Sequence, residues 1–157
     1  MKNLNSIKLQ DLLSLKNRNV LIIGGAGYLG TPMTETFAEL GANVILASRN
    51  EAKSQKIIKK VKKIYKNKRI NFIKTDITNE KSLKRLKEQV GKKFKNGLDV
   101  LVNCGWSGNK NTFESISKKD WDFDLEVCLT SVFKTIKIFL PELKKKSGNI
   151  LNIGSSY

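Results

Sequence analysis

Short apolar runs alternate with longer amphipathic segments along most of this chain. Runs rich in Val, Ile and Leu are typical of strands that are buried on both faces of a parallel sheet. The pattern therefore predicts strands over residues 20–23, 44–47, 70–74, 98–103 and 149–153.

The segments between these runs carry apolar residues every three or four positions, which predicts helices packed on one side. The first helix covers residues 29–40 and ends at Gly41, and a lysine-rich helix covers about residues 51–66. Thr78 is expected to cap the next helix. The apolar positions of that helix are Leu83, Leu86, Val90 and Phe94.

A long helix is predicted after Ser117 and Asp120, which have the spacing of a capping box. Pro141 is expected to kink or end this helix, because proline removes a backbone donor. Its apolar positions are Trp121, Leu125, Leu129, Val132, Ile136 and Leu140.

Strands that alternate with helices require right-handed crossovers and a parallel sheet covered on both faces. No internal repeat, linker or low-complexity segment divides the 157 residues. The sequence therefore predicts a single α/β domain of the doubly wound type over residues 1–157.

The net charge of +16 is a feature shared with nucleic-acid-binding proteins. Here, however, many lysines fall within residues 53–66, where they alternate with apolar residues as on the solvated face of an amphipathic helix. Aromatic residues are not interleaved with these charges. We therefore expect no specific nucleic-acid partner. The alternative, polyanion binding by the lysine faces, predicts an affinity that falls steeply with salt.

Other function classes are excluded by what the sequence lacks. No apolar run approaches the ~20 residues of a membrane span, and the N-terminal residues do not have the pattern of a signal peptide. Cys104 and Cys128 have neither metal-site nor disulfide-framework spacing, and the chain has no histidine. We expect a cytoplasmic protein with no metal site and no membrane partner.

A glycine-rich turn follows the first predicted strand, in the sequence V-L-I-I-G-G-A-G-Y-L-G. Gly24, Gly27 and Gly30 recur every third residue, and a helical pattern follows them. A strand that turns through glycines into a helix can hold a dinucleotide pyrophosphate against the helix N-terminus. We therefore expect this turn, including Tyr28 and Leu29, to bind a cofactor; the alternative is a glycine-rich connection without a ligand.

Further short motifs lie at the ends of the predicted elements. They are G-A-N-V-I-L-A-S-R-N across the second strand, D-I-T-N after the third, L-V-N-C-G-W at the end of the fourth, V-C-L-T-S-V-F within the long helix and G-N-I-L-N-I-G-S-S-Y at the C-terminal end. With the glycine turn, they resemble the short-chain dehydrogenase/reductase family from about Leu15 to the last residue. The resemblance implies a Rossmann-like doubly wound sheet with strand order 3-2-1-4-5, and implies that the C-terminal part of the family fold is missing.

The resemblance also implies a nicotinamide dinucleotide cofactor. Ser48 and Arg49 lie where the family contacts the adenosine ribose; an arginine there favours a 2′-phosphate, so we expect NADP(H), with NAD as the alternative. Asp76 and Ile77 match the pair that flanks the adenine ring. A solvent-facing Arg49 and a turn-forming Asp76 are the structural alternatives.

After the fourth strand, Asn103, Cys104 and Gly105 match the family turn that passes under the nicotinamide ribose. The structural alternative is an asparagine that ties neighbouring strands together. Ser155 matches the serine whose hydroxyl hydrogen-bonds the substrate oxygen. Cys128, however, replaces the family's helix asparagine, and a thiol is the poorer hydrogen-bond donor.

The family members transfer hydride between nicotinamide and a small hydroxyl or carbonyl compound. The stretch N-C-G-W-S-G-N-K-N is similar to members encoded near bacterial surface-polysaccharide and flagellin-glycan genes, which suggests a sugar. The family's Tyr-x-x-x-Lys motif does not follow Ser155 within these residues. We therefore expect the front part of an oxidoreductase, which binds NADP(H) but does not turn over substrate alone.

Other interpretations stay open at this stage. One is a non-catalytic dinucleotide-binding module, which would explain Cys128 and the Ile23 that replaces the family's threonine. Another is a sugar-nucleotide epimerase or dehydratase of the extended branch of the superfamily. Members of the family commonly pair through the long helix, which carries Cys128 and Phe133 here, so a homo-oligomer is expected for a full-length form.

Overall fold

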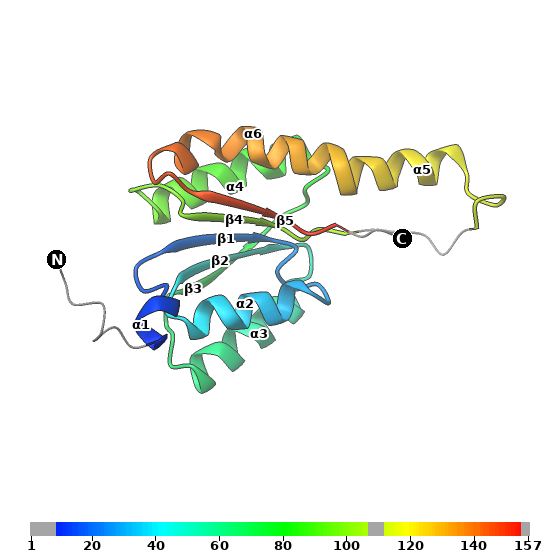
Figure 1. The fold of residues 1–157 in the computed structure, drawn as a ribbon. Coiled ribbons are helices and arrows are strands. Elements are labelled where there is room, and N and C mark those ends of the chain that lie inside the picture. Colours follow the sequence, from blue (N-terminus) through cyan, green and yellow to red (C-terminus); the bar gives the residue numbers. More distant parts are fainter. Residues whose placement is uncertain (1–8, 107–111, 155–157) are drawn as a thin grey trace.

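The computed structural model describes residues 9–106 and 112–154. Its centre is a five-stranded parallel sheet in the order β3-β2-β1-β4-β5 (Figure 1). The strands are β1 (Asn19–Ile23), β2 (Asn43–Ser48), β3 (Ile70–Lys74), β4 (Val100–Asn103) and β5 (Asn149–Asn152). The predicted Rossmann-like fold class and the predicted strand order are both confirmed.

Helices cover the two faces of this sheet. The elements are α1 (Leu9–Leu13), α2 (Gly30–Glu39), α3 (Glu51–Ile64), α4 (Glu80–Lys93), α5 (Lys118–Leu125), the π-helical segment η2 (Glu126–Thr130) and α6 (Ser131–Lys144). In Figure 1, α2 and α3 lie on one side of the sheet, and α4 and α6 lie on the other. Helix α5 continues the line of α6 beyond the end of the sheet (Figure 1).

The strands are continuous apolar runs because successive side chains point to opposite faces and both faces are buried. Leu21 and Ile45 belong to the core cluster formed with α4 and α6. Val20 and Ile22 belong to the second cluster, formed with α2 and α3. All four are fully buried, so the sheet is a rigid base for the loops at its carboxyl ends.

The predicted cap of α4 is wrong, and of the two effects expected of Pro141, a kink or an end of the helix, the end is not found. The cap of α4 is Asn79, not Thr78: the Asn79 side chain accepts from the Ser82 N–H at 3.0 Å. The Thr78 hydroxyl instead donates to Asp76. Pro141 does not end α6, which continues through it to Lys144. Pro141 is exposed and lies in the last turn of α6, so the backbone hydrogen bond that proline removes is close to the end of the helix.

The long predicted helix consists of α5, η2 and α6 in direct succession. Its N-terminal cap is confirmed, since the Ser117 side chain accepts from the Asp120 N–H at 3.1 Å. The π-helical segment in the middle was not predicted. Such segments insert one residue into a helix and occur frequently at functional sites. Here the segment contains Val127 and Cys128.

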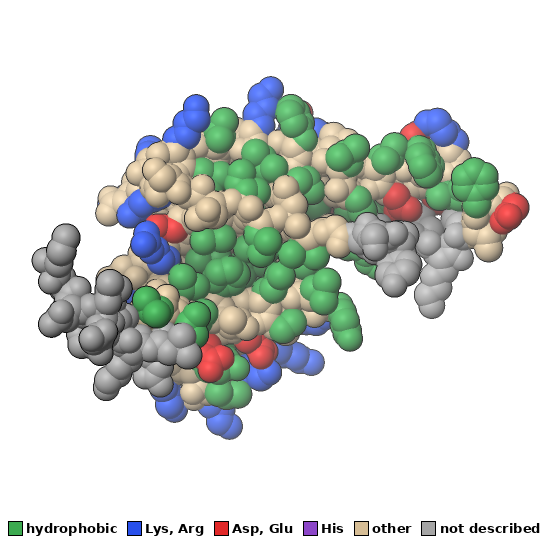
Figure 2. All heavy atoms as spheres, in the orientation of Figure 1, with side chains coloured by type: hydrophobic (Ala, Val, Ile, Leu, Met, Phe, Trp, Pro, Cys, Tyr) green, Lys and Arg blue, Asp and Glu red, His purple; other side chains and the backbone are tan. Residues whose placement is uncertain are grey.

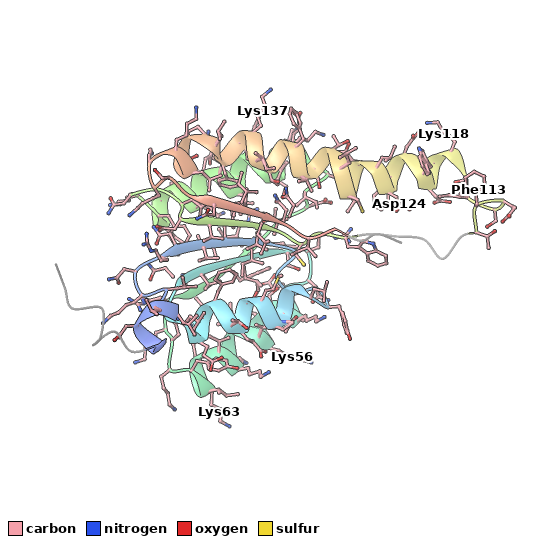
Figure 3. The ribbon with its side chains drawn as sticks, in the orientation of Figure 1. Lys56, Lys63, Phe113, Lys118, Asp124 and Lys137 are labelled. Carbon is pink, nitrogen blue, oxygen red and sulfur yellow. The ribbon has the colours of Figure 1, made fainter. Side chains whose placement is uncertain are left out.

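The lysine-rich helix α3 is amphipathic as predicted. Its buried side is formed by Ser54, Ile57, Ile58 and Val61. Lys56 and Lys63 are exposed and extend away from the molecule (Figure 3). In Figure 2, hydrophobic side chains gather in the middle of the molecule, whereas Lys and Arg lie mainly around its periphery. Within the described residues, no helix is both long enough and apolar enough to span a membrane.

Candidate functional site

A cavity of about 840 Å³ lies where β1, β2, β3 and β4 end. Open parallel sheets bind their ligands at this edge, outside the carboxyl ends of the strands. The cavity wall includes most of the residues predicted to bind a cofactor: Gly24, Gly27, Tyr28, Leu29, Ser48, Arg49, Asp76, Ile77, Cys104 and Gly105. The fold therefore brings together residues that are far apart in the sequence.

The turn after β1 requires glycine at Gly24. Its φ of +76° is rare for any other residue, and an added Cβ would lie 2.6 Å from the Cys104 carbonyl oxygen. The Gly27 N–H donates to the Gly24 carbonyl at 2.8 Å, which closes the turn. Because Gly24 and Gly27 carry no side chains, a ligand can approach the peptide groups closely at these two positions of the cavity wall.

Helix α2 begins at Gly30, directly behind this turn. Gly30 is buried and does not line the cavity; an added Cβ would overlap the Gly24 carbonyl oxygen. Leu29 occupies the N-cap position, and among the described residues no side chain caps this helix end. The Thr31 N–H is bonded to the Gly27 carbonyl and Pro32 has no N–H, so it is mainly the positive end of the helix dipole that favours an anion at the cavity wall. This end of the helix, with the glycine turn before it, fits a dinucleotide pyrophosphate.

The end of β2 supplies polar and charged groups. Ser48 is half-buried, and its hydroxyl accepts from the Asn50 N–H at 3.3 Å. Arg49 is exposed and lines the cavity. Among the described residues, Arg49 has no hydrogen-bond or ion-pair partner, so its guanidinium is available to an anionic ligand.

The end of β3 is an ordered turn built on Asp76. One carboxylate oxygen of Asp76 accepts from the Thr78 N–H at 3.0 Å and from the Thr78 hydroxyl at 2.8 Å. The Thr75 N–H donates to the Ser48 carbonyl at 3.0 Å, which fixes this turn beside the end of β2. The turn-forming role considered for Asp76 is therefore present, and Asp76 and Ile77 also line the cavity.

Asn103 does not line the cavity. Its side chain is buried below the wall, where the amide N–H₂ donates to Asn152 at 2.9 Å and the amide oxygen accepts from the Thr135 hydroxyl at 2.8 Å. These bonds join β4 to β5 and to α6, as the structural alternative for this residue requires. Contact between Asn103 and a nicotinamide ribose stays a prediction. Ser155 lies outside the described residues.

Cys104 and Cys128 both line the cavity, although they come from different parts of the chain. Cys104 follows β4 and is half-buried, and burial raises the pKa of its thiol above the ordinary value. Cys128 is exposed and lies in the π-helical segment. Among the described residues, no group of His, Cys, Asp or Glu side chains could hold a metal ion.

Alkylation by iodoacetamide is expected to be several-fold slower at Cys104 than at Cys128. The thiolate is the reactive form, and a raised pKa lowers its fraction at neutral pH, so the Cys104 rate should rise as the pH increases through 8 and 9. Peptide mass spectrometry after timed labelling measures both rates in one sample. Faster labelling of Cys104 than of Cys128 at pH 7 would contradict the partial burial of the Cys104 thiol.

Several residues of the wall were not among the predicted cofactor contacts. Trp106, after β4, is 75% exposed at the edge of the cavity, and Val127 and Cys128 enter it from the π-helical segment. Thr75 and Asn50 complete the ends of β3 and β2. The positions just after the strand ends could have indicated Thr75, Asn50 and Trp106, whereas no sequence signal marks the π-helical segment.

Comparison with known proteins agrees with this geometry. The family model described as short chain dehydrogenase matches residues 18–157 of the chain. The chain belongs to the short-chain dehydrogenase family. The match covers the glycine turn, all the strands and the residues that form the cavity.

Individual relatives are distant but cover most of the chain. Dehydrogenase/reductase SDR family member 6 of Rattus norvegicus is 30% identical over 142 residues, which are 90% of this chain and 53% of that protein. The L-fucose dehydrogenase of Mus musculus is 29% identical, over 87% of this chain and 48% of that protein. The chain thus spans about half the length of these two relatives.

Among solved structures, the Pseudomonas aeruginosa RhlG/NADP active-site complex superimposes with a TM-score of 0.81 at 26% identity. The superposition covers 91% of this chain and 56% of that one. The match thus covers a little over half of that neighbour, close to the share covered in the two sequence relatives.

Proposed function

We propose that this chain is the dinucleotide-binding portion of an NADP(H)-dependent oxidoreductase. The observation that carries the proposal is the cavity at the carboxyl ends of the strands, which joins an uncapped glycine turn to an unpartnered Arg49. The reaction class is hydride transfer between nicotinamide and a small hydroxyl or carbonyl compound. The family membership supports that class.

In this proposal each part of the wall binds one part of the cofactor. The turn at Gly24 and Gly27 holds the pyrophosphate with backbone N–H groups. Ser48 and Arg49 contact the adenosine ribose, and Asp76 and Ile77 lie along the adenine. Cys104 and Gly105 lie under the nicotinamide ribose. When bound, the nicotinamide supplies or accepts the hydride.

The charge at the end of β2 favours NADP(H) over NAD(H). An arginine can form two hydrogen bonds to a 2′-phosphate, whereas NAD-binding members of this fold use an acidic residue that bonds the 2′-hydroxyl. No acidic residue lies at positions 48 or 49. The structural neighbour that contains NADP supports the same choice.

The substrate is proposed to be a small hydroxyl or carbonyl compound of the sugar class. The similarity to a protein named L-fucose dehydrogenase supports this class. Ser155 is proposed to hydrogen-bond the substrate oxygen. We propose that turnover needs more than these 157 residues, because the Tyr-x-x-x-Lys motif that would exchange the proton does not follow Ser155 in them.

A homo-oligomer is proposed for a full-length form. Leu129 and Phe133, on η2 and α6, are 65% and 62% exposed, and large apolar side chains on one helix surface are typical of protein interfaces. The proposed contact between subunits uses only the long helix formed by α5, η2 and α6.

One observation favours a second candidate, a dinucleotide-binding module without catalysis. Cys128 lines the cavity at the position of the family's helix asparagine. A thiol is a weak hydrogen-bond donor and would not replace an amide in a proton relay. Such a module would bind NADPH tightly while a longer form of the protein would show no turnover.

Replacing Arg49 with glutamine is expected to weaken NADPH binding about tenfold and to leave NADH binding nearly unchanged. The variant loses the charge-assisted contact to the 2′-phosphate, which contributes ~1.5 kcal/mol to the binding free energy. Titration of dinucleotide fluorescence measures both dissociation constants.

The matched control is Lys56→Gln, which removes one positive charge from an exposed site on α3 outside the cavity (Figure 3). This control should bind both dinucleotides like the unmodified chain. An equal loss of NADPH affinity in both variants would assign the effect to net charge. An unmodified chain that binds neither dinucleotide would contradict the proposed function.

A further inference from the structure

A second hollow, of about 390 Å³, adjoins the cofactor cavity on the side of β3 and α4. Its wall is formed by Arg49, Lys74, Thr75, Asp76, Ser82 and Arg85. Arg49, Thr75 and Asp76 line both spaces. The second hollow is thus a side extension of the cofactor cavity at its adenosine end.

The local structure explains how the cations reach this hollow. Lys74 is the last residue of β3 and pairs in register with Ser48, directly before Arg49. Ser82 and Arg85 are three residues apart on α4 and therefore share one helix face. The Ser82 hydroxyl accepts from the Asp76 N–H at 2.9 Å, which holds that face of α4 against the end of β3.

The positive charges around this hollow are not neutralised within the described residues. Arg49, Lys74 and Arg85 have no hydrogen-bond or ion-pair partner there. Elsewhere, Lys60 is paired with Glu35 at 2.8 Å. Three unpaired cations around one concavity form a local positive potential that favours an anion.

The single carboxylate of the wall is Asp76. One of its oxygens is engaged by the backbone and the hydroxyl of Thr78 at 3.0 and 2.8 Å, so part of its charge is already satisfied by donors. The wall of the hollow therefore carries three positively charged side chains and one carboxylate. The hollow therefore favours an anion of more than one charge over a neutral or cationic group.

We infer that Lys74 and Arg85, acting with Arg49, determine selectivity for the 2′-phosphate carried by the adenosine half of the cofactor. This inference rests on the proposed function, and it places two selectivity residues on β3 and α4, outside the segment after β2. Arg49 borders both spaces, so a phosphate that it binds lies at the opening of the hollow. Lys74 and Arg85 line the same hollow, and their long side chains contact the phosphate there in this proposal.

The test uses fragments that need no nicotinamide and no turnover. Adenosine 2′,5′-bisphosphate and 5′-AMP are titrated calorimetrically into the chain and its Lys74→Gln/Arg85→Gln variant at fixed ionic strength. We expect the preference for the bisphosphate to fall about tenfold in the double variant, since each exposed cation contributes about threefold. Binding of 5′-AMP should stay within about twofold.

The matched control is Lys84→Gln/Lys92→Gln, which removes two exposed charges from α4 outside both spaces. It should keep the bisphosphate preference. An unchanged preference in the Lys74/Arg85 variant, or an equal fall in the control, would overturn this inference and leave the proposed function intact. If the unmodified chain binds neither fragment, the proposed function itself fails.

Discussion

Replacing Gly30 with alanine is expected to destabilise the fold by about 2–3 kcal/mol and to abolish NADPH binding, because overpacking against backbone atoms costs this much. The added Cβ would overlap the Gly24 carbonyl oxygen and lie 2.8 Å from the Gly25 Cα. These are backbone atoms of the glycine turn and cannot rotate away. Either α2 moves away from the sheet or the turn opens, and both changes displace the N–H groups proposed to hold the pyrophosphate.

Gly91→Ala is the matched control. Gly91 lies inside α4, and an added Cβ would meet nothing within 4 Å. Alanine there should stabilise the protein by about 0.5–1 kcal/mol, since glycine is the poorer helix former. Urea unfolding followed by circular dichroism compares the two variants. A Gly30→Ala protein as stable as the unmodified chain would contradict the close approach of α2 to the turn.

Replacing Phe139 with alanine is expected to lower the free energy of unfolding by about 3–5 kcal/mol. Phe139 is fully buried between α6 and the sheet, in the cluster with Leu101 and Phe94. Its truncation removes buried apolar contacts and leaves a cavity in a close-packed core. Because domains of this size are stabilised by only about 5–15 kcal/mol, much of the total is lost.

Phe133→Ala provides the comparison on the same helix. Phe133 is 62% exposed, so its truncation should change stability by no more than about 0.5 kcal/mol. Thermal and urea unfolding of the two variants measure the difference. Similar losses in both would contradict the orientation of α6, which turns Phe139 toward the sheet and Phe133 toward solvent.

The strands and their order were predictable because the sheet is buried on both faces. Runs such as 20–23 then contain only apolar residues, and the glycine turn marks where β1 passes into α2. The helix boundaries were less predictable. Thr78 and Asn79 are neighbouring residues that both favour caps, and only the path of the chain after Asp76 decides between them.

The π-helical segment could not be predicted for a different reason. Inserting one residue between α5 and α6 changes one set of backbone hydrogen bonds but leaves the spacing of Leu125, Leu129 and Val132 close to helical. The sequence therefore indicated one continuous helix. Val127 and Cys128, both in this π-helical segment, line the cavity wall.

Within the candidate site, residues at strand ends were the predictable ones. Gly24 and Arg49 directly follow β1 and β2, Asp76 comes two residues after β3, and the fold brings these strand ends to one edge. Asn103 also ends a strand, yet its side chain points below the wall because Asn152 and Thr135 satisfy its amide. The direction of a side chain depends on such partners from distant elements, which a local sequence pattern does not contain.

Hydrogen–deuterium exchange with and without saturating NADPH tests the central claim most directly. We predict slower exchange at the amides of residues 24–31, 48–50, 75–78 and 104–106, which form the glycine turn and the ends of β2, β3 and β4. The exchange rates of the backbone amides in the lysine-rich helix α3 should not change. Protection confined to α3, or no protection at the glycine turn, would contradict a dinucleotide site at this edge of the sheet.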